Sequence, residues 1–253
     1  MTLPDARVGP PGLLRLFIVF HESEALGAGR SVVNCLEGLR ELGWTASGWF
    51  PERGPLVDEA SGLLAPNVFE SRPIAYSVRG WRAAPGVVPR LATTPAHLRR
   101  FRHALLAARP HVVHANTLRV LPEAAIARSL GIPVVLHVHE LPDVTTKSSL
   151  ALRWAARTAD VLVAVSAAVA ARLRPYAGTT PVLTVPNGVP LLGWELRPDR
   201  GTVGTVGTIC RTKGTDIFLE AAAIARARSP YLLFEHVGAG LLDNDLSFAH
   251  RVE

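Results

Sequence analysis

Cysteine, lysine and long apolar runs are scarce in this 253-residue sequence, and each scarcity excludes a class of protein. The two cysteines, Cys35 and Cys210, have no second cysteine or histidine at metal-ligand spacing, so we expect free, buried thiols and no structural zinc site. The apolar run Leu13–Phe20 is interrupted by Arg15 and is far shorter than the roughly 20 residues of a membrane-spanning helix. No secretory signal precedes it, and we therefore expect a cytoplasmic protein.

The net charge of +6 would suit nucleic acid, anionic lipid or a phosphorylated substrate as the partner. Aromatic residues make up only 6% of the chain, and the positive charge is almost all arginine, scattered along the sequence. A groove for single-stranded nucleic acid interleaves basic residues with aromatic ones. We therefore expect no nucleic-acid partner.

Short, Val-rich apolar runs alternate with longer segments of helical periodicity, an order typical of a doubly wound α/β fold with a parallel sheet. The expected strands are Leu14–Phe20, Val112–His114, Val134–Val138, Val161–Val165, Pro181–Val185, Val203–Val206 and Leu232–Val237. The stretch from Pro51 to Arg90 is rich in Pro and Gly, and we expect only one or two short strands or helices in it.

Two segments between the expected strands have clear helical spacing. Gly29–Leu42 is closed by Gly43, and its predicted inner face consists of Val32, Val33, Leu36, Leu39 and Leu42. Pro95–Ala108 has a predicted inner face of Leu98, Phe101, Leu105 and Leu106, and a basic outer face of Arg99, Arg100 and Arg102. That basic face is either an ordinary solvated surface or a peripheral contact with the inner face of an anionic membrane.

The pattern of strands and helices predicts two domains. Residues 13–190 are expected to form a complete domain, 191–200 a linker, and 201–253 the first part of a second domain. The stretch after the linker suffices for one β-α-β unit, whereas an open sheet usually has several strands. We therefore expect the second domain to be incomplete in this chain.

Polar residues follow four of the expected strands, at the edge where an open parallel sheet binds its ligands. They are His21, Glu22 and Ser23, then His114 to Asn116, then His139 and Glu140, and finally Ser166. Each one alone is explained as a strand end or as a helix cap, which is how we interpret Ser166. Their joint position predicts one cleft, although the carboxylates of Glu22 and Glu140 do not settle its chemistry.

Two glycine-containing turns lead into helices, whose free amide groups can bind an anion. Leu26–Gly29 lacks the third glycine of the dinucleotide fingerprint, so we expect no NAD site. The turn from Gly207 to Thr215 holds Arg211 and Lys213, which would stabilise a diphosphate leaving group. Its Lys-Gly order excludes a Walker A loop, and a solvated basic loop is the alternative.

Taken in order, these motifs resemble those of the retaining family 4 glycosyltransferases. The segment from Leu26 to Leu36 is similar to the family's Gly-Gly-Ala-Glu-Arg turn and first helix, and Val185–Val189 matches its Val-Pro-Asn-Gly-Val motif. Further strand motifs of the family are similar to Pro110–Asn116, Val134–Glu140 and Ala159–Ser166. The resemblance implies a GT-B type α/β fold, with one complete Rossmann-like domain and an incomplete second one.

The resemblance implies transfer of a hexose from a nucleoside diphosphate sugar to a sugar, lipid-linked or other acceptor, with retention and without a cofactor or metal. It implies catalytic roles for His139 and Glu140, and acceptor-side roles for His21, Arg30 and Asn116. The implied donor-binding residues are Gly27, Ala28, Gly207, Arg211, Lys213 and Gly238. Asp243-Asn-Asp245 has a metal-binding form, but we interpret it as a turn.

Two departures from the family pattern bear on activity. Thr208 stands where the family's phosphate loop has arginine, which leaves that contact to Arg211. The family's later Glu-x7-Glu element, which holds the donor sugar and ribose, is not in the sequence. Because two domains must close over the donor, we expect impaired transfer by this chain. A non-catalytic acceptor- or partner-binding remnant and a GT-B type epimerase are the alternatives.

Overall fold

The structure is a computed structural model that describes residues 14–68, 87–142, 145–189, 193, 201–210 and 213–238. The chain divides into two compact units, Met1–Leu191 (unit 1) and Leu192–Glu253 (unit 2). Of the predicted linker 191–200, only Gly193 is described, so the predicted domain boundaries stay predictions.

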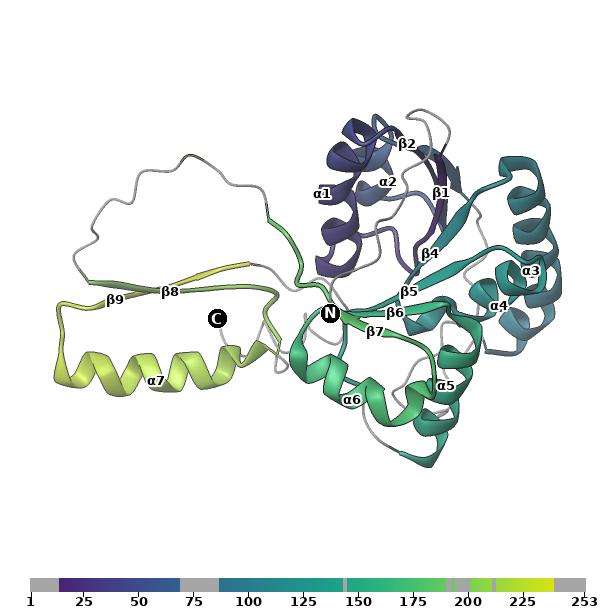
Figure 1. The fold of residues 1–253 in the computed structure, drawn as a ribbon. Helices are drawn as coiled ribbons and strands as arrows, with labels where there is room; N and C mark the ends of the chain where they lie inside the picture. Colours follow the sequence, from purple (N-terminus) through teal and green to yellow (C-terminus); the bar gives the residue numbers. More distant parts are fainter. Residues whose placement is uncertain are drawn as a thin grey trace. The chain divides into compact units, whose positions relative to one another are not determined.

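Unit 1 contains a seven-stranded sheet whose strands are all parallel, in the order β3-β2-β1-β4-β5-β6-β7 (Figure 1). The predicted α/β class with a parallel, doubly wound sheet is therefore confirmed. The strand order reverses between β1 and β4, which makes their carboxyl ends the expected place for a ligand. The strands are β1 Leu14–Val19, β2 Trp44–Phe50, β3 Ala65–Val68, β4 Val112–Asn116, β5 Val134–Val138, β6 Val161–Ala164 and β7 Val182–Thr184.

Helices cover both faces of this sheet (Figure 1). On β1, Leu16 and Ile18 face one apolar cluster that also contains Leu36 of α1 and Leu56 of α2. Phe17 and Val19 face a second cluster, which α3, α4, α5 and α6 complete. The strand is buried on both sides, which explains its unbroken apolar run. The helices are α1 Gly27–Glu41, α2 Pro55–Ala60, α3 Val87–Ala108, η1 Leu118–Val120, α4 Leu121–Ser129, α5 Thr146–Thr158 and α6 Ala167–Ala177.

Three helices of unit 1 end at a glycine with positive φ. Gly43, Gly131 and Gly178 have φ of 82°, 74° and 59°, a conformation that favours glycine. Each of these glycines leads the chain from a helix into the amino end of a strand, namely β2, β5 and β7. The predicted end of the first helix at Gly43 is confirmed.

Several details differ from the predictions. Strand β2 was not expected, and α3 begins at Val87 rather than Pro95, with Pro95 inside the helix. Leu42 and Leu106 are 66% and 46% exposed, so the predicted inner faces of the two helices were too wide. Both cysteines are free as expected, but Cys35 is exposed rather than buried. The predicted cap is confirmed, because the Ser166 hydroxyl accepts a hydrogen bond from the Val169 amide.

Unit 2 consists, in its described part, of two parallel strands and one helix. Strands β8 (Thr202–Val206) and β9 (Leu233–Val237) pair along their whole length, and α7 (Thr215–Arg228) connects them. The two predicted strands are therefore confirmed. Thr215 is the only described residue of this unit that is buried.

Across the described ranges, none of the helices combines the length and the apolar character that crossing a bilayer requires.

Candidate functional site

The carboxyl ends of β1, β4 and β5 lie next to one another in the sheet. Strand β4 pairs with β1 on one side and with β5 on the other, and Asn116 lies in register with His137. Four of the predicted site residues follow or end these strands, namely His21, Asn116, His139 and Glu140. The sheet order therefore brings together side chains that are separated by up to about half of the sequence.

Asn116 connects two of these ends to the first helix. Its Oδ1 atom lies 2.7 Å from Nε2 of His139, and its Nδ2 atom donates to the carbonyl oxygen of Ala28 at 3.0 Å. Asn116 is fully buried, so both hydrogen bonds are shielded from water. The predicted site residues Ala28, Asn116 and His139 are thus held as one hydrogen-bonded group.

His21 and Glu22 follow β1 at the same edge. Nε2 of His21 lies 3.3 Å from Oε2 of Glu22, and the His21 side chain is almost completely buried. These two residues also act electrostatically on His139: His21 lowers its pKa and Glu22 raises it. The charge on the β1 side of the cleft therefore affects the ring on the β5 side.

Three histidines form a cluster, which we call the histidine cluster: His114 on β4, His137 on β5 and His139 just after β5. The ring centroids of His137 and His139 are 4.0 Å apart, and those of His114 and His137 are 5.4 Å apart. Burial lowers the pKa of His114 to about 4 and that of His137 to about 3, and neighbouring histidines add to both shifts. The pKa of His139 falls to about 4, first because of burial and then because of His21. All three rings are therefore neutral at pH 7.

The backbone between β4 and η1 is strained. Thr117 has φ of 124°, which is rare for a β-branched residue. Its hydroxyl accepts a hydrogen bond from the Arg119 amide at 3.1 Å. The Arg119 guanidinium in turn lies 3.5 Å from Oε1 of the predicted catalytic residue Glu140, whose side chain is 62% exposed. Neither Arg119 nor His137 is among the site residues predicted from the sequence. Arg119 closely follows the polar run at the end of β4, which could have drawn attention to it.

The start of α1 carries the remaining predicted residues of unit 1. Gly27 is exposed, and a Cβ atom added there would meet nothing within 4 Å. Arg30 forms an exposed ion pair with Glu59 at 2.8 Å, and this pair links α1 to α2. The structure therefore gives Arg30 a partner in α2 rather than in the group around Asn116.

In unit 2, the turn between β8 and α7 is closed by several backbone contacts. Thr215 Oγ1 lies 3.3 Å from both the amide nitrogen and the carbonyl oxygen of Cys210, and Gly214 precedes the helix with φ of 70°. The side chain of Lys213 approaches Gly207 and is exposed. A Cβ atom at Gly238 would overlap the carbonyl oxygen of Gly207. The chain just after β8 and the chain just after β9 can therefore come this close only because residue 238 is a glycine. Arg211 lies outside the described residues.

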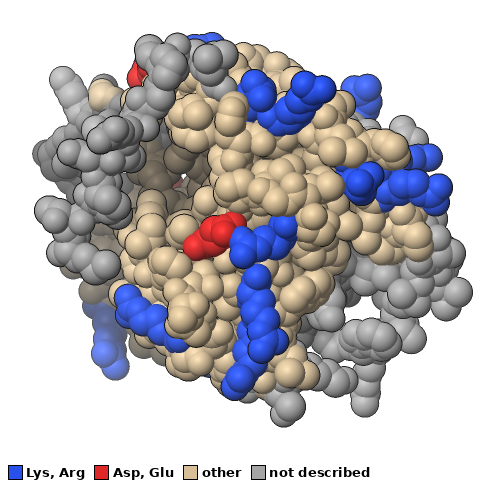
Figure 2. Space-filling model, turned by 45° about the vertical axis from the view of Figure 1, so that its right-hand side comes forward, with Lys and Arg blue, Asp and Glu red and all other residues tan. Residues whose placement is uncertain are grey.

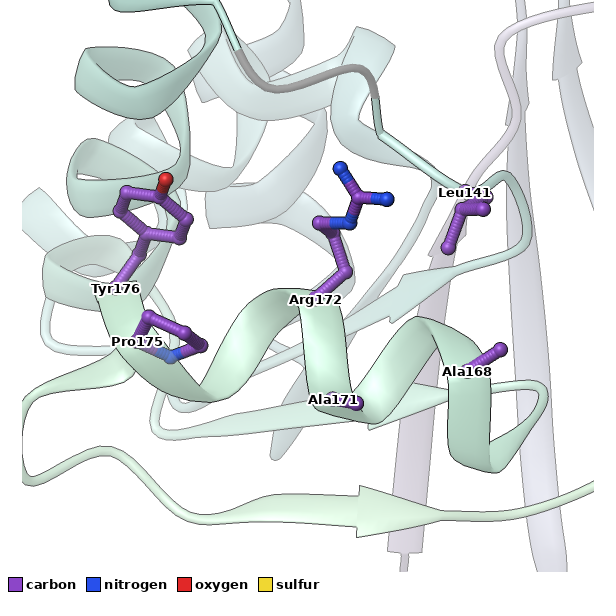
Figure 3. A pocket seen from close by; sticks show the side chains of 6 residues that line it. All are labelled: Leu141, Ala168, Ala171, Arg172, Pro175 and Tyr176. Atoms are coloured by element: carbon purple, nitrogen blue, oxygen red, sulfur yellow. The ribbon is translucent and has the colours of Figure 1, made fainter.

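A hollow of about 410 Å³ lies beside α6 and begins one residue after Glu140 (Figure 3). Arg172 and Tyr176 point to the same side of α6, and Leu141 lies across from the helix start (Figure 3). The other lining residues are Ala168, Ala171 and Pro175. This surface is open to solvent and mostly apolar, with one positive charge.

Basic side chains predominate over acidic ones on the face of the molecule shown in Figure 2. The predicted outer face of α3 is confirmed, because Arg99, Arg100 and Arg102 are all exposed. Among the described residues, no three His, Cys, Asp or Glu side chains are grouped so that they could hold a metal ion. Asp243 and Asp245 lie outside the described residues.

The sheet order defines an open α/β domain, and the polar edge between β1, β4 and β5 is its candidate ligand site. The sequence model of Glycosyltransferase Family 4 matches residues 26–191, which is more than half of the chain. The chain therefore belongs to glycosyltransferase family 4. Among curated proteins, no sequence matches the chain.

Solved GT-B structures have the same fold. HepE from Anabaena in complex with UDP has a TM-score of 0.69 and 16% identity, and the match covers 95% of this chain and 64% of HepE. The sucrose-phosphate synthase from Thermosynechococcus elongatus has a TM-score of 0.60 and 17% identity, with 94% and 66% covered. The UDP-GlcNAc 2-epimerase from Neisseria meningitidis has a TM-score of 0.63 and 12% identity, with 94% and 69% covered. This chain thus spans about 64% of the length of HepE.

Proposed function

We propose that this chain is the acceptor-side domain and the first part of the donor-side domain of a transferase. The reaction is the transfer of a hexose from a nucleoside diphosphate sugar to an acceptor, with retention and without a bound metal. By itself the chain has impaired activity, because the donor must be enclosed by two domains.

The observation that carries this proposal is the meeting of His21, Asn116 and His139 at the strand switch, in a chain of family 4. The neutral His139 ring, held by a buried amide and close to His21, forms a rigid polar edge that suits a sugar site. In unit 2, the exposed Lys213 beside the start of α7 suits a diphosphate, since a helix start attracts anions. The UDP bound by HepE supports UDP as the first nucleotide to test.

Calorimetric titration of the 253-residue chain with UDP, GDP and ADP tests the proposal. We expect one nucleotide to bind, and Lys213→Ala to weaken that binding by about tenfold or more, because a charge-assisted hydrogen bond is lost. Lys147→Ala is the matched control, since it removes the only other lysine and lies in α5 of unit 1. Equal binding by the wild type and both variants would contradict a phosphate site at Lys213.

Two other functions are compatible with the same fold. A remnant that binds only an acceptor or a protein partner would bind no nucleotide in this titration. A GT-B epimerase is favoured only by the likeness to the Neisseria enzyme, which at 12% identity concerns the fold. Such an enzyme would convert a nucleotide sugar without any acceptor, so incubation of the donor alone separates it from a transferase.

We also propose that the exposed arginines of α3 meet an anionic membrane from the cytoplasmic side, where a lipid-linked acceptor would lie. Cosedimentation with anionic and with neutral vesicles tests this contact, and equal binding to both would contradict it.

A further inference from the structure

Asn116 lies where three elements of unit 1 meet. It ends β4, its Nδ2 atom reaches the first turn of α1 at the Ala28 carbonyl, and its Oδ1 atom reaches His139 after β5. The side chain is 0% exposed, so neither hydrogen bond can be exchanged for one to water. The strained Thr117 follows directly, which fixes the backbone on the other side.

The direction of each hydrogen bond follows from its partner. A backbone carbonyl oxygen can only accept, so the NH₂ group of Asn116 must face Ala28. The Asn116 carbonyl oxygen is then the atom that faces His139, at 2.7 Å from Nε2. An amide oxygen has no hydrogen to give, and therefore Nε2 of His139 must carry one. Turning the amide over would place two acceptors together at Ala28, so the opposite assignment is excluded.

The other nitrogen of this ring is left as an acceptor. The groups that face His139 are His21 and Glu22 after β1, His137 on β5 and His114 on β4. Burial and then His21 lower the pKa of His139 to about 4 against the opposing effect of Glu22, so the ring is neutral at pH 7 and Nδ1 carries no hydrogen. Nδ1 is buried and, among the described residues, has no hydrogen-bond partner.

We propose that Asn116 is a positioning residue that holds His139 as its Nε2–H tautomer and fixes the ring to the first turn of α1. The use of this arrangement rests on the proposed function: in a transferase, His139 offers the sugar a fixed, neutral surface. With Nε2 engaged and Nδ1 buried, the ring is not placed to transfer a proton. The two residues and the Ala28 carbonyl act as one rigid element of the cleft.

Nitrogen-15 NMR of the histidine rings in the full 253-residue chain tests the proposal, with His139→Gln to assign the signals. At pH 7, we expect His139 to be predominantly the Nε2–H tautomer. Asn116→Leu removes the acceptor and should lower the ratio of Nε2–H to Nδ1–H by about fivefold, the change that corresponds to one net hydrogen bond. Asn116→Asp keeps an acceptor, so it should keep the tautomer and raise the pKa of His139.

Ser31→Ala is the matched control. The Ser31 hydroxyl donates to the same Ala28 carbonyl at 2.9 Å and is also buried, but it has no contact with His139. Its loss should leave the tautomer ratio unchanged. A predominant Nδ1–H tautomer in the wild type would overturn the proposal even if Asn116→Leu does not fold, and so would an unchanged ratio in a folded Asn116→Leu. Because no nucleotide is needed, failure of the proposed transferase function would leave this result intact.

Discussion

At the scale of single residues, the histidine cluster is unusual because its rings are buried and neutral. Nε2 of His114, both nitrogens of His137 and Nδ1 of His139 have no hydrogen-bond partner among the described residues. A buried ring of this kind resists protonation, because its charged form would lose water without gaining a partner. The cluster therefore connects the stability of unit 1 to pH.

The direction of this dependence follows from the pKa values. In the unfolded chain each histidine titrates near 6.5, whereas in the folded chain the pKa is about 4 for His114 and about 3 for His137. Between these values the unfolded chain binds protons that the folded chain does not. Stability should therefore be unaffected above pH 7 and fall as the pH drops from about 6.5 to 4, by at most about 1.4 kcal/mol per pH unit for each ring.

Urea unfolding of unit 1 at pH 7 and pH 5 measures this loss. His137→Gln removes the central titrating ring and should make the fall in the unfolding midpoint smaller. His103→Gln is the control, since His103 lies on the exposed face of α3 and belongs to no such cluster. If both variants lose the same stability between pH 7 and pH 5 as the wild type, the cluster is not the cause.

The sequence was sufficient to place His21, Asn116 and His139 together, because each ends or follows a strand with an unmistakable apolar run. It could not reveal how Asn116 is used, since Ala28 lies 88 positions away. His137 escaped notice for another reason: inside an apolar strand, a histidine has the same spacing as the core residues around it. The roles assigned to the predicted site residues, catalytic, donor-binding and acceptor-side alike, stay predictions.

At the scale of secondary-structure elements, β2 shows where sequence patterns fail. Its central residues Thr45, Ala46, Ser47 and Gly48 are small or polar, and the large apolar residues stand only at its ends, Trp44 at the start and Trp49 and Phe50 at the finish. A Cβ atom at Gly48 would press against the ring of Phe50 and a methyl group of Leu64, so a larger residue there would force these core side chains to shift. Tertiary contacts, rather than the strand's own propensity, therefore determine this element.

The contact between α3 and α4 depends on a buried polar pair. Nε2 of His97 on α3 lies 2.7 Å from Oε1 of Glu123 on α4, and each side chain is 1% exposed. The His97 ring also packs edge-on against Trp49 of β2, with 5.5 Å between the ring centroids. Polar groups buried this deeply contribute to stability only while both partners are present.

Removing one partner should therefore be costly. We expect Glu123→Ala to lower the free energy of unfolding by about 3–5 kcal/mol, because it leaves His97 buried without this acceptor. Glu59→Ala is the matched control: it breaks the exposed pair with Arg30 and should cost about 1 kcal/mol or less. Urea unfolding measures both, and equal losses would contradict a special role for the buried pair.

At the scale of the whole molecule, the two units differ in how much they bury. Unit 1 holds both apolar clusters of the described chain, whereas unit 2 leaves Val206 83% and Ile217 69% exposed. The hydrogen bonds between β8 and β9 therefore lack the apolar cover that protects β1, β4 and β5. Few buried contacts and exposed backbone hydrogen bonds are the marks of a segment that opens locally.

Hydrogen exchange should separate the two units. We expect the amides of β8 and β9 to exchange at least about a hundredfold faster than those of β1, β4 and β5, a difference of about 3 kcal/mol in opening free energy. Saturating nucleotide should slow exchange near Lys213 if the donor site works as proposed. Equal protection of both sheets would contradict the expected difference.

The three glycines that end α1, α4 and α6 all lie on the amino edge of the sheet, opposite the residues of the candidate site. Reversal of the chain and recognition of the ligand are thus assigned to separate edges of one sheet. Over evolutionary time, the turns at Gly43, Gly131 and Gly178 can lengthen or change in sequence without disturbing the group around Asn116. The turn sequences on the amino edge can therefore change independently of the candidate-site residues on the opposite edge, which can themselves be kept or replaced.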